Sequence, residues 1–257
     1  MLRTLEATEY ITPLREGGSL PGVVRAEDGN TYAMKFIGAG QGVKTLIAEL
    51  IAGEIARVLG FNMPELVLLN LDPKIGASEP DAEIQDLLNF SAGLNLGMAF
   101  LEHSLPFSKA LFPSFTESFA SRLVWFDAFI TNVDRTPRNV NMLIHQNDIW
   151  LIDHGAALYF QHNWQDHYKQ AETPFALVKD HVLISDASEI RYADEECKSL
   201  LNRTIFETIV NMIPYAWLET DKMFDSPEAY RNGFVEYLDH RLKHSDVFVR
   251  EVERVRT

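Results

Sequence analysis

The chain of 257 residues is 46% hydrophobic and 23% charged, which is ordinary for a folded protein and long enough for a large core or two lobes. Its formal net charge of −14 argues against nucleic acid as the main ligand, because acidic surfaces repel phosphate. No apolar run approaches the ~20 residues that cross a bilayer. The start, MLRTLEATEY, lacks the apolar core of a signal peptide, and the single cysteine excludes an internal disulfide. We therefore expect a cytoplasmic protein.

The first part of the chain carries strand and turn signals around one strong helix. TLEATEYI contains β-formers, REGGSLPG has turn residues, and VVRAEDGNTYAMKFIG predicts a hairpin about Asp-Gly-Asn. Apolar residues at helical spacing predict a helix over 43–60, where Gly60 supplies the stop. PELVLLNL predicts a buried strand, residues 81–89 a short helix, and NLGMAFLEHSLP a strand ending at Pro106.

The second part of the chain is predicted to be largely helical. One short β pair, VNMLIH and IWLIDH, is expected around a turn at QND. Helical periodicity returns in DEECKSLLNRTIFETIVNMI and in SPEAYRNGFVEYLDHRLKHS. The change of character places a boundary near residues 103–106. We therefore predict an α+β fold with a β-rich unit over 1–103 and a mainly helical unit over 104–257.

This order of elements matches what ATP chemistry requires. A glycine-rich turn allows the backbone to approach phosphates, and we place Gly17, Gly18 and Ser19 of EGGSLPG there. Lys35, on the next predicted strand, is placed to reach phosphate oxygens. Glu49 on the following helix would hold that lysine, with Glu54 as its rival on another face of the helix.

The loop NVDRTPRNVNML carries the predicted catalytic residues. Asp134 is the candidate catalytic base, and Asn139 follows it at the interval of the protein-kinase loop H-R-D-x-x-x-x-N. Asp153, in IWLIDHGAAL, takes the place of the metal-binding aspartate of D-F-G. Asn139 and Asp153 offer oxygen ligands of the kind that Mg²⁺ prefers, and Asp134 would orient the attacking hydroxyl.

Each of these residues also has a purely structural interpretation. Asp134 and Asn139 favour loops and could only cap turns. Lys35 could be a solvated lysine on an edge strand, and Glu49 an ordinary surface charge of a helix. We predict that His154 packs beside Asp153. The aromatic residues of the preceding apolar stretch, Trp125, Phe126 and Phe129, are expected to lie in the core. Three further residues are too scattered in the sequence to form a metal site: His162, His167 and Cys197. The combination of these features favours chemistry over turn capping.

The segments FDAFITNVDRTPRNVNMLI and IWLIDHGAAL resemble the HipA-like kinase family, particularly its short, stand-alone branch. The resemblance is strong from Trp125 to Leu158 and weaker toward the N-terminus. It implies a bilobal protein-kinase-like fold that uses Mg-ATP to phosphorylate serine or threonine. It also implies a hinge at Phe100 and Glu102, where the backbone would bind the adenine edge. Members of the family can phosphorylate a serine in the glycine-rich loop and so switch themselves off, which makes Ser19 a candidate.

The chain departs from the family pattern at several positions. Asn132 and Val133, rather than His-Arg, precede Asp134, and Thr136 stands where many relatives have a histidine. No lysine follows two residues after Asp134, so Arg135 or Arg138 would have to supply positive charge there. A toxin role does not carry over to this shorter chain.

Two alternatives to a serine/threonine kinase remain open. The same residues would serve a small-molecule or lipid kinase, because the D-R-x-x-x-N core also resembles phosphoinositide kinases. A pseudokinase that senses nucleotide or binds a partner would keep the fold without turnover. The sequence predicts ATP as ligand and an unidentified protein or small molecule as phosphate acceptor.

Overall fold

We describe a computed structural model of the chain, covering residues 2–14, 20–40, 42–77, 79–112, 115–219 and 223–256. The chain divides into two units, one formed by Met1–Leu50 with Pro64–His103 and the other by Ile51–Met63 with Ser104–Thr257. Helix α1 (Val43–Val58) contains the first of these divisions. The predicted Gly60 stop adopts φ +81°, a left-handed conformation that ends helices readily.

The first unit is built on a five-stranded closed barrel in the order β1-β2-β3-β5-β4. Its strands are β1 (Thr4–Pro13), β2 (Gly22–Ala26), β3 (Thr31–Lys35), β4 (Leu66–Leu71) and β5 (Gly93–Ala99). Only β1 and β4 pair in parallel among these neighbours. The predicted Asp-Gly-Asn turn joins β2 to β3, with Gly29 at φ +83°.

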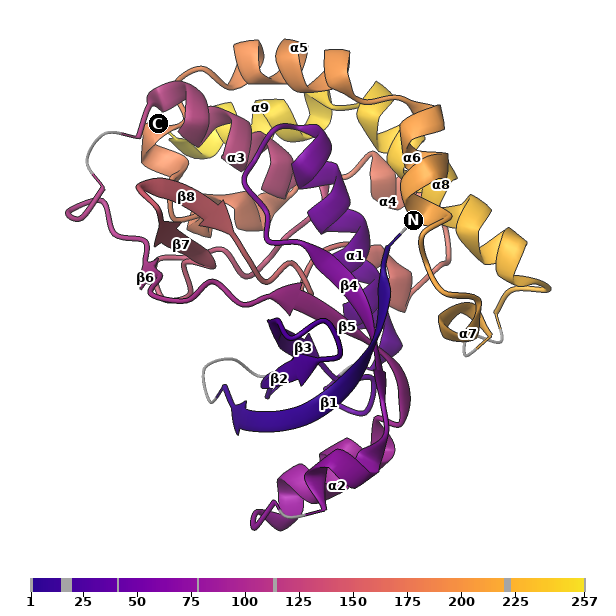
Figure 1. Cartoon of the computed structure of the whole chain (residues 1–257). Coiled ribbons are helices and arrows are strands. Elements are labelled where there is room, and N and C mark those ends of the chain that lie inside the picture. The colour runs from indigo at the N-terminus through magenta and orange to yellow at the C-terminus, as the bar shows by residue number, and fades with distance from the viewer. Residues whose placement is uncertain are drawn as a thin grey trace. The chain divides into compact units, whose positions relative to one another are not determined.

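Apolar side chains fill the barrel of the first unit. Buried residues from its strands, including Val24, Met34, Val67 and Leu69, form one cluster. The short helix α2 (Ala82–Phe90) adds Ile84 and Leu88 to that cluster. Ile75 of the 3₁₀ helix η1 (Pro73–Gly76) packs against the cluster. Figure 1 shows α2 at the end of the strands. Asp81 caps α2 by accepting a hydrogen bond from the backbone of Glu83.

One predicted strand is shorter than expected. The strand predicted over NLGMAFLEHSLP ends at Ala99, because His103 turns the chain with φ +59°. Leu105 and Pro106 then form β6, which pairs with a different sheet of the second unit, in the order β6-β7-β8. Strands β7 (Met142–His145) and β8 (Asp148–Leu151) form the predicted hairpin.

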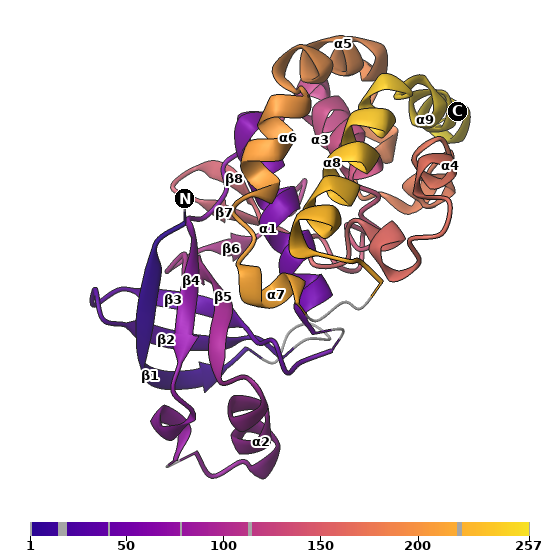
Figure 2. The same cartoon turned by 90° about the vertical axis from the view of Figure 1, so that its right-hand side faces the viewer.

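Helices dominate the second unit. They are α3 (Glu117–Phe129), α4 (His167–Ala171), α5 (Ile190–Leu200), α6 (Arg203–Val210), α7 (Tyr215–Leu218), α8 (Pro227–Lys243) and α9 (Asp246–Arg256), with 3₁₀ helices η2 (Tyr159–His162), η3 (Ala176–Asp180) and η4 (Ile184–Asp186). α3 packs against α5 and α9, and α8 packs against α4 and α6 (Figure 2). The periodic segment 194–213 forms two helices, because Asn202 takes an extended conformation and caps α6.

Helix α3 is the most buried helix of this unit and leads directly into the polar loop. Trp125, Phe126 and Phe129 are fully buried, as predicted, and Trp125 stacks on Phe129 with ring centroids 5.2 Å apart. No helix of the described segments combines the length and apolar character needed to cross a membrane.

Candidate active site

Hydrogen bonds within the loop after α3 bring Asp134 and Asn139 together. The backbone N–H of Thr136 donates to the carbonyl of Asn139 at 2.9 Å, and the N–H of Asn139 donates back to the carbonyl of Thr136 at 3.1 Å. This closed turn directs the Asn139 side chain to Asp134, where Nδ2 donates to Oδ2 at 2.7 Å. Both residues are half-buried. The five-residue interval seen in the sequence is therefore the interval that one tight turn spans.

The β7–β8 hairpin carries Asp153 back to this loop. Gln146 and Asn147 make the turn with φ of 52° and 64°, and Met142 pairs with Leu151. Continuing that register, the N–H of Ile152 donates to the carbonyl of Asn141 at 3.1 Å. The Asn141 amide in turn donates to the Asp153 carbonyl at 3.4 Å. Asp153 is thus positioned beside the strand that begins just after Asn139.

The backbone of Asp153 is held in an unusual conformation. Its φ is +56°, in the left-handed region that residues other than glycine seldom occupy. Such conformations persist where the surrounding structure over-determines them, and they concentrate at functional sites. Asp153 is half-buried, whereas the following residue, His154, is fully buried. His154 is structural, as predicted, because its ring lies edge-on to Phe126 with centroids 5.7 Å apart and its Nε2 lies 2.9 Å from Arg135 Nη2.

A fully buried polar network lies behind the loop and was not predicted from the sequence. Its centre is Asp127 of α3, whose Oδ1 accepts from Asn132 Nδ2 at 2.8 Å. Asp127 Oδ2 accepts from Arg135 Nε at 2.6 Å and lies 2.9 Å from His181 Nε2. Asn132 Oδ1 also accepts from the backbone N–H of Asp134 at 3.1 Å, so the network fixes the backbone at the candidate base. The only signal in the sequence was an acid inside the apolar run LVWFDAFI.

Arg135 extends the network to the Asp153 side of the loop. It donates through Nη1 to the carbonyl of Asn141, and its Nη2 lies 2.9 Å from His154 Nε2. Its guanidinium is therefore enclosed by Asp127, Asn141 and His154, and it is not placed to supply positive charge beside Asp134. The sequence left that role to Arg135 or Arg138. Of the two, Arg138 is the exposed one.

The network determines the charge state of Asp127. Burial by itself would raise the pKa of this carboxyl, but the charge of Arg135 and the hydrogen bond from His181 outweigh burial, so its pKa lies below the ordinary value of 3.8. Asp127 is thus an ionised, hydrogen-bonded anchor for the loop.

Lys35 and Glu49 form an ion pair within the first unit. Lys35 Nζ lies 2.5 Å from Glu49 Oε2, and the exposed fractions of the two side chains are 11% and 1%. Glu54, the rival on the helix, instead pairs with Arg57 at 3.3 Å. The buried glutamate therefore holds the strand lysine as the sequence predicted, and the surface interpretation of both residues does not apply.

The remaining predicted residues are less completely defined. Phe100 is 38% exposed and Glu102 is exposed, but the backbone N–H of Phe100 already donates to the carbonyl of Thr31 at 3.0 Å. A nucleotide hinge there would have to use other backbone groups. Gly17, Gly18 and Ser19 lie outside the described residues.

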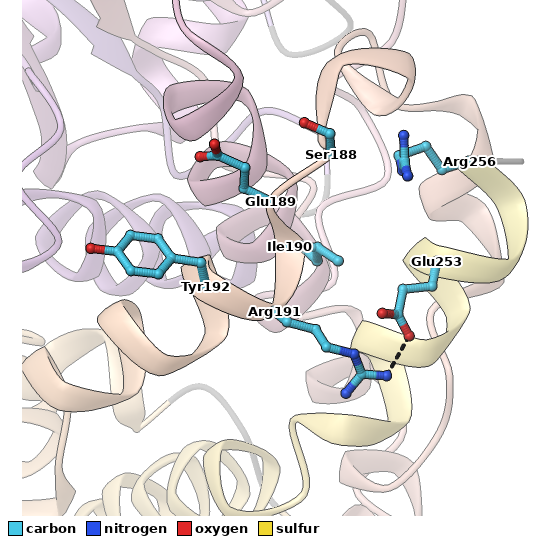
Figure 3. Close-up of a pocket in the computed structure, with 7 residues that line it drawn as sticks. All are labelled: Ser188, Glu189, Ile190, Arg191, Tyr192, Glu253 and Arg256. Atoms are coloured by element: carbon cyan, nitrogen blue, oxygen red, sulfur yellow. Dashed lines mark hydrogen bonds and ion pairs between the residues drawn. The ribbon is translucent and has the colours of Figure 1, made fainter.

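A pocket of the second unit contains none of the predicted site residues. It is lined by the start of α5 and by Glu253 and Arg256 of α9, and Figure 3 shows the Arg191–Glu253 ion pair across it. His162, His167 and Cys197 do not come together as a group of metal ligands within the described residues. Cys197 is buried in α5, and burial raises the pKa of its thiol to about 12.

Comparison with known proteins identifies the family. A family model described as HipA-like kinase matches residues 7–250. The chain belongs to the HipA-like kinase family. The resemblance seen in the sequence is therefore confirmed, and the protein is a kinase. No curated protein matches the chain in sequence.

A solved kinase structure shares the fold of this HipA-like kinase. The crystal structure of a Helicobacter pylori proinflammatory kinase, CtkA, is 13% identical with a TM-score of 0.55, over 91% of this chain and 94% of that one. A Golgi casein kinase with Mn/ADP bound is 11% identical with a TM-score of 0.45, over 95% of this chain and 73% of that one. The mixed α and β content of both units agrees with the predicted α+β class.

Proposed function

We propose that this HipA-like kinase transfers the γ-phosphoryl group of Mg-ATP to a serine or threonine hydroxyl of a protein. The observation that carries the proposal is the Asp134–Asn139 contact of 2.7 Å, formed in a loop whose backbone is fixed by a buried ionic network. Phosphoryl transfer depends chiefly on positioning and charge neutralisation, and the fixed loop supports the first of these.

The roles follow from the environment of each side chain. Asp134, half-buried and held by Asn139, orients the acceptor hydroxyl and accepts its proton. The Asn139 side-chain amide donates through Nδ2 to the Asp134 carboxylate, so the Asn139 Oδ1 points away from that carboxylate. That oxygen and the carboxylate of Asp153 are hard ligands that fit Mg²⁺, which would neutralise charge on the phosphates. The left-handed backbone conformation of Asp153 supports this role, since such conformations concentrate at functional sites.

The first unit is proposed to bind the nucleotide. Lys35, steadied by buried Glu49, would contact the α- and β-phosphates. Residues 1–103, with the Gly17–Gly18–Ser19 turn and a hinge near Phe100 and Glu102, would act as the ATP clamp. Residues 104–257 would carry the catalytic and metal-binding residues, which gives the bilobal arrangement of a protein kinase.

Thermal unfolding with nucleotide tests the metal dependence of binding. We expect the melting temperature to rise with ATP plus Mg²⁺ and hardly at all with ATP plus chelator, because the chain is strongly acidic and Lys35 is the cation assigned to the phosphates. An equal rise in both conditions would contradict metal-bridged binding.

Phosphate transfer then separates the candidate functions. Labelled ATP is incubated with the protein, Mg²⁺ and either a generic protein acceptor or a panel of small alcohols and phosphoinositides. We expect label on serine or threonine of protein. Label only on small molecules would instead indicate a small-molecule or lipid kinase, and nucleotide binding without any transfer would indicate a pseudokinase.

Two substitutions separate the roles of the aspartates. Asp153→Asn should weaken Mg-ATP binding, because it removes a charged metal ligand. Asp134→Asn should leave binding nearly intact and lower turnover. Asp148→Asn, at an exposed position of β8, serves as the matched control. If both variants lose Mg-ATP binding equally, Asp134 is a metal ligand and the assignment is wrong.

A further inference from the structure

Three potential metal ligands meet at the end of α8, in residues that the kinase chemistry does not use. They are Glu172, His240 and His244, whose ligand atoms all lie within 4.8 Å of one another. His240 Nε2 lies 2.7 Å from Glu172 Oε1, and His244 Nε2 lies 4.0 Å from the same oxygen. Among the residues that the structure describes, no other three His, Cys, Asp or Glu side chains come together in this way.

The local structure explains why the two imidazoles converge. His240 and His244 are four residues apart in and just after α8, so they lie on one face of the helix, with ring centroids 4.2 Å apart. Two histidines at this spacing can bind one zinc ion. His244 Nδ1 lies 2.8 Å from the carbonyl of His240, and the hydrogen bond it donates leaves Nε2 as the nitrogen available to a metal.

Buried Arg241 positions the third ligand. Its Nη1 donates to the carbonyls of Ala171 and Thr173, at 2.9 and 3.2 Å. These two residues flank Glu172, so the backbone on both sides of the carboxylate is tied to α8. α4 and α8 pack side by side in Figure 2, which agrees with this connection. The main chain at Glu172 is therefore fixed beside α8, while its exposed side chain can still rotate.

The electrostatics of the place favour a cation. The C-terminal end of α8 carries partial negative charge from the helix dipole. Glu236, one turn earlier on α8, lies 3.6 Å from His167 and adds further negative charge. Lys243 is engaged with Asp239 at 2.6 Å, and Arg241 is buried on the inner side.

We propose that Glu172, His240 and His244 bind a first-row transition-metal dication, with Zn²⁺ the ion that the ligand set fits best. Two imidazole nitrogens and one carboxylate oxygen form a three-ligand set that water completes to a tetrahedron. Tetrahedral zinc places its ligand atoms about 3.3 Å apart. The Glu172–His240 separation of 2.7 Å must open slightly and the Glu172–His244 separation of 4.0 Å must close, which side-chain rotation permits. The ion would join the end of α4 to the end of α8.

A zinc titration in excess Mg²⁺ and without nucleotide tests the proposal. Competition with a chromophoric chelator should show one equivalent bound to the native chain with a dissociation constant of about 10 µM or lower. His240→Ala and His244→Ala should each weaken binding by at least about 10-fold, since loss of even an outer-shell partner costs that much. His145→Ala, which removes a histidine on β7 outside the cluster, should bind like the native chain.

Two further measurements make the result independent of folding. Glu172→Gln changes an exposed side chain and preserves its shape, so it reports on the site even if a histidine variant fails to fold. Co²⁺ bound to the native chain should show the visible absorption of a tetrahedral ion, and the Glu172→Gln protein should lose it. The proposal is overturned if the native chain binds no zinc tighter than about 1 mM, or if Glu172→Gln and His145→Ala bind zinc alike.

Discussion

Asp127 and Asp134 lie close together in the sequence but occupy opposite environments. Asp127 is fully buried and has three side-chain partners, Asn132, Arg135 and His181. Asp134 is half-buried, and its carboxylate contacts the Asn139 amide. A carboxylate enclosed by donors is committed to holding the chain in place, whereas a partly exposed one can still receive a substrate. The comparison separates an anchoring region from a reacting region within one loop.

The largest expected effect is on turnover. Asp134→Asn should lower ATP-dependent phosphate transfer by about 10²–10⁴-fold, because it removes the group that accepts the proton. Its free energy of unfolding should change by less than about 1 kcal/mol, since no buried partner is lost. Steady-state transfer rates and urea unfolding measure the two quantities. An unfolded Asp134→Asn protein would show that Asp134 belongs to the anchoring region.

The anchoring region should respond in the opposite way. Arg135→Met removes one partner of a fully buried pair and should lower the free energy of unfolding by about 3–5 kcal/mol. Arg138→Met, at an exposed position of the same loop, should stay within about 0.5 kcal/mol of the native chain. Urea unfolding of the two variants gives the comparison. Equal stabilities would show that the buried network does not anchor the loop.

Lys35 and Glu49 test the distinction between anchoring and reacting residues in the first unit. Their ion pair is nearly buried, yet we assign it to nucleotide binding. Glu49→Gln should cost about 1–3 kcal/mol of stability and should also weaken the interaction with ATP, measured as KM. Glu54→Gln, on a glutamate that pairs only with Arg57 among the contacts described, is the matched control. A change in stability with no change in KM would place the pair with the anchors.

The smallest effect concerns pH. The pKa of Asp127 is lower in the folded chain than its ordinary 3.8, so the folded state binds this proton less readily than the unfolded state. Its contribution to stability is complete above pH 3.8 and is lost as pH falls toward the folded pKa. The free energy of unfolding of Asp127→Asn should therefore fall less steeply on acidification than that of the native chain. The two slopes should differ by at most about 1.4 kcal/mol per pH unit. Unfolding at several pH values between neutral and acidic compares the slopes. Parallel slopes would contradict an ionised Asp127.

Local patterns in the sequence predicted much of the fold. The Asp-Gly-Asn hairpin, the helix ending at Gly60 and the strands β7 and β8 each depend on turn chemistry or periodicity that a short window contains. The five-residue spacing of Asp134 and Asn139 was visible in the sequence, whereas the contact between their side chains was not predicted. The end of β5 was misplaced, because its sheet partners, β3 and β4, come from distant parts of the chain.

The buried network could not be predicted for the same reason. His181 reaches Asp127 across a long stretch of chain, and nothing in its neighbouring residues marks it as a partner. Arg135 was interpreted as a possible source of charge beside Asp134, because the sequence does not reveal the direction of a side chain after a loop. Glu172, His240 and His244 were not singled out, since Glu172 is far from the two histidines in the sequence and meets them only in the fold.

Arg241 also bears on the order in which the chain can mature during synthesis. It donates through Nε and Nη2 to the carbonyls of Phe129 and Ala128, at the end of the helix that precedes the catalytic loop. During synthesis these two carbonyls cannot accept hydrogen bonds from Arg241 until translation has passed residue 241. A nascent chain can therefore hold every proposed catalytic residue, and the buried network around Asp127, before the end of α3 has all of its hydrogen-bond partners.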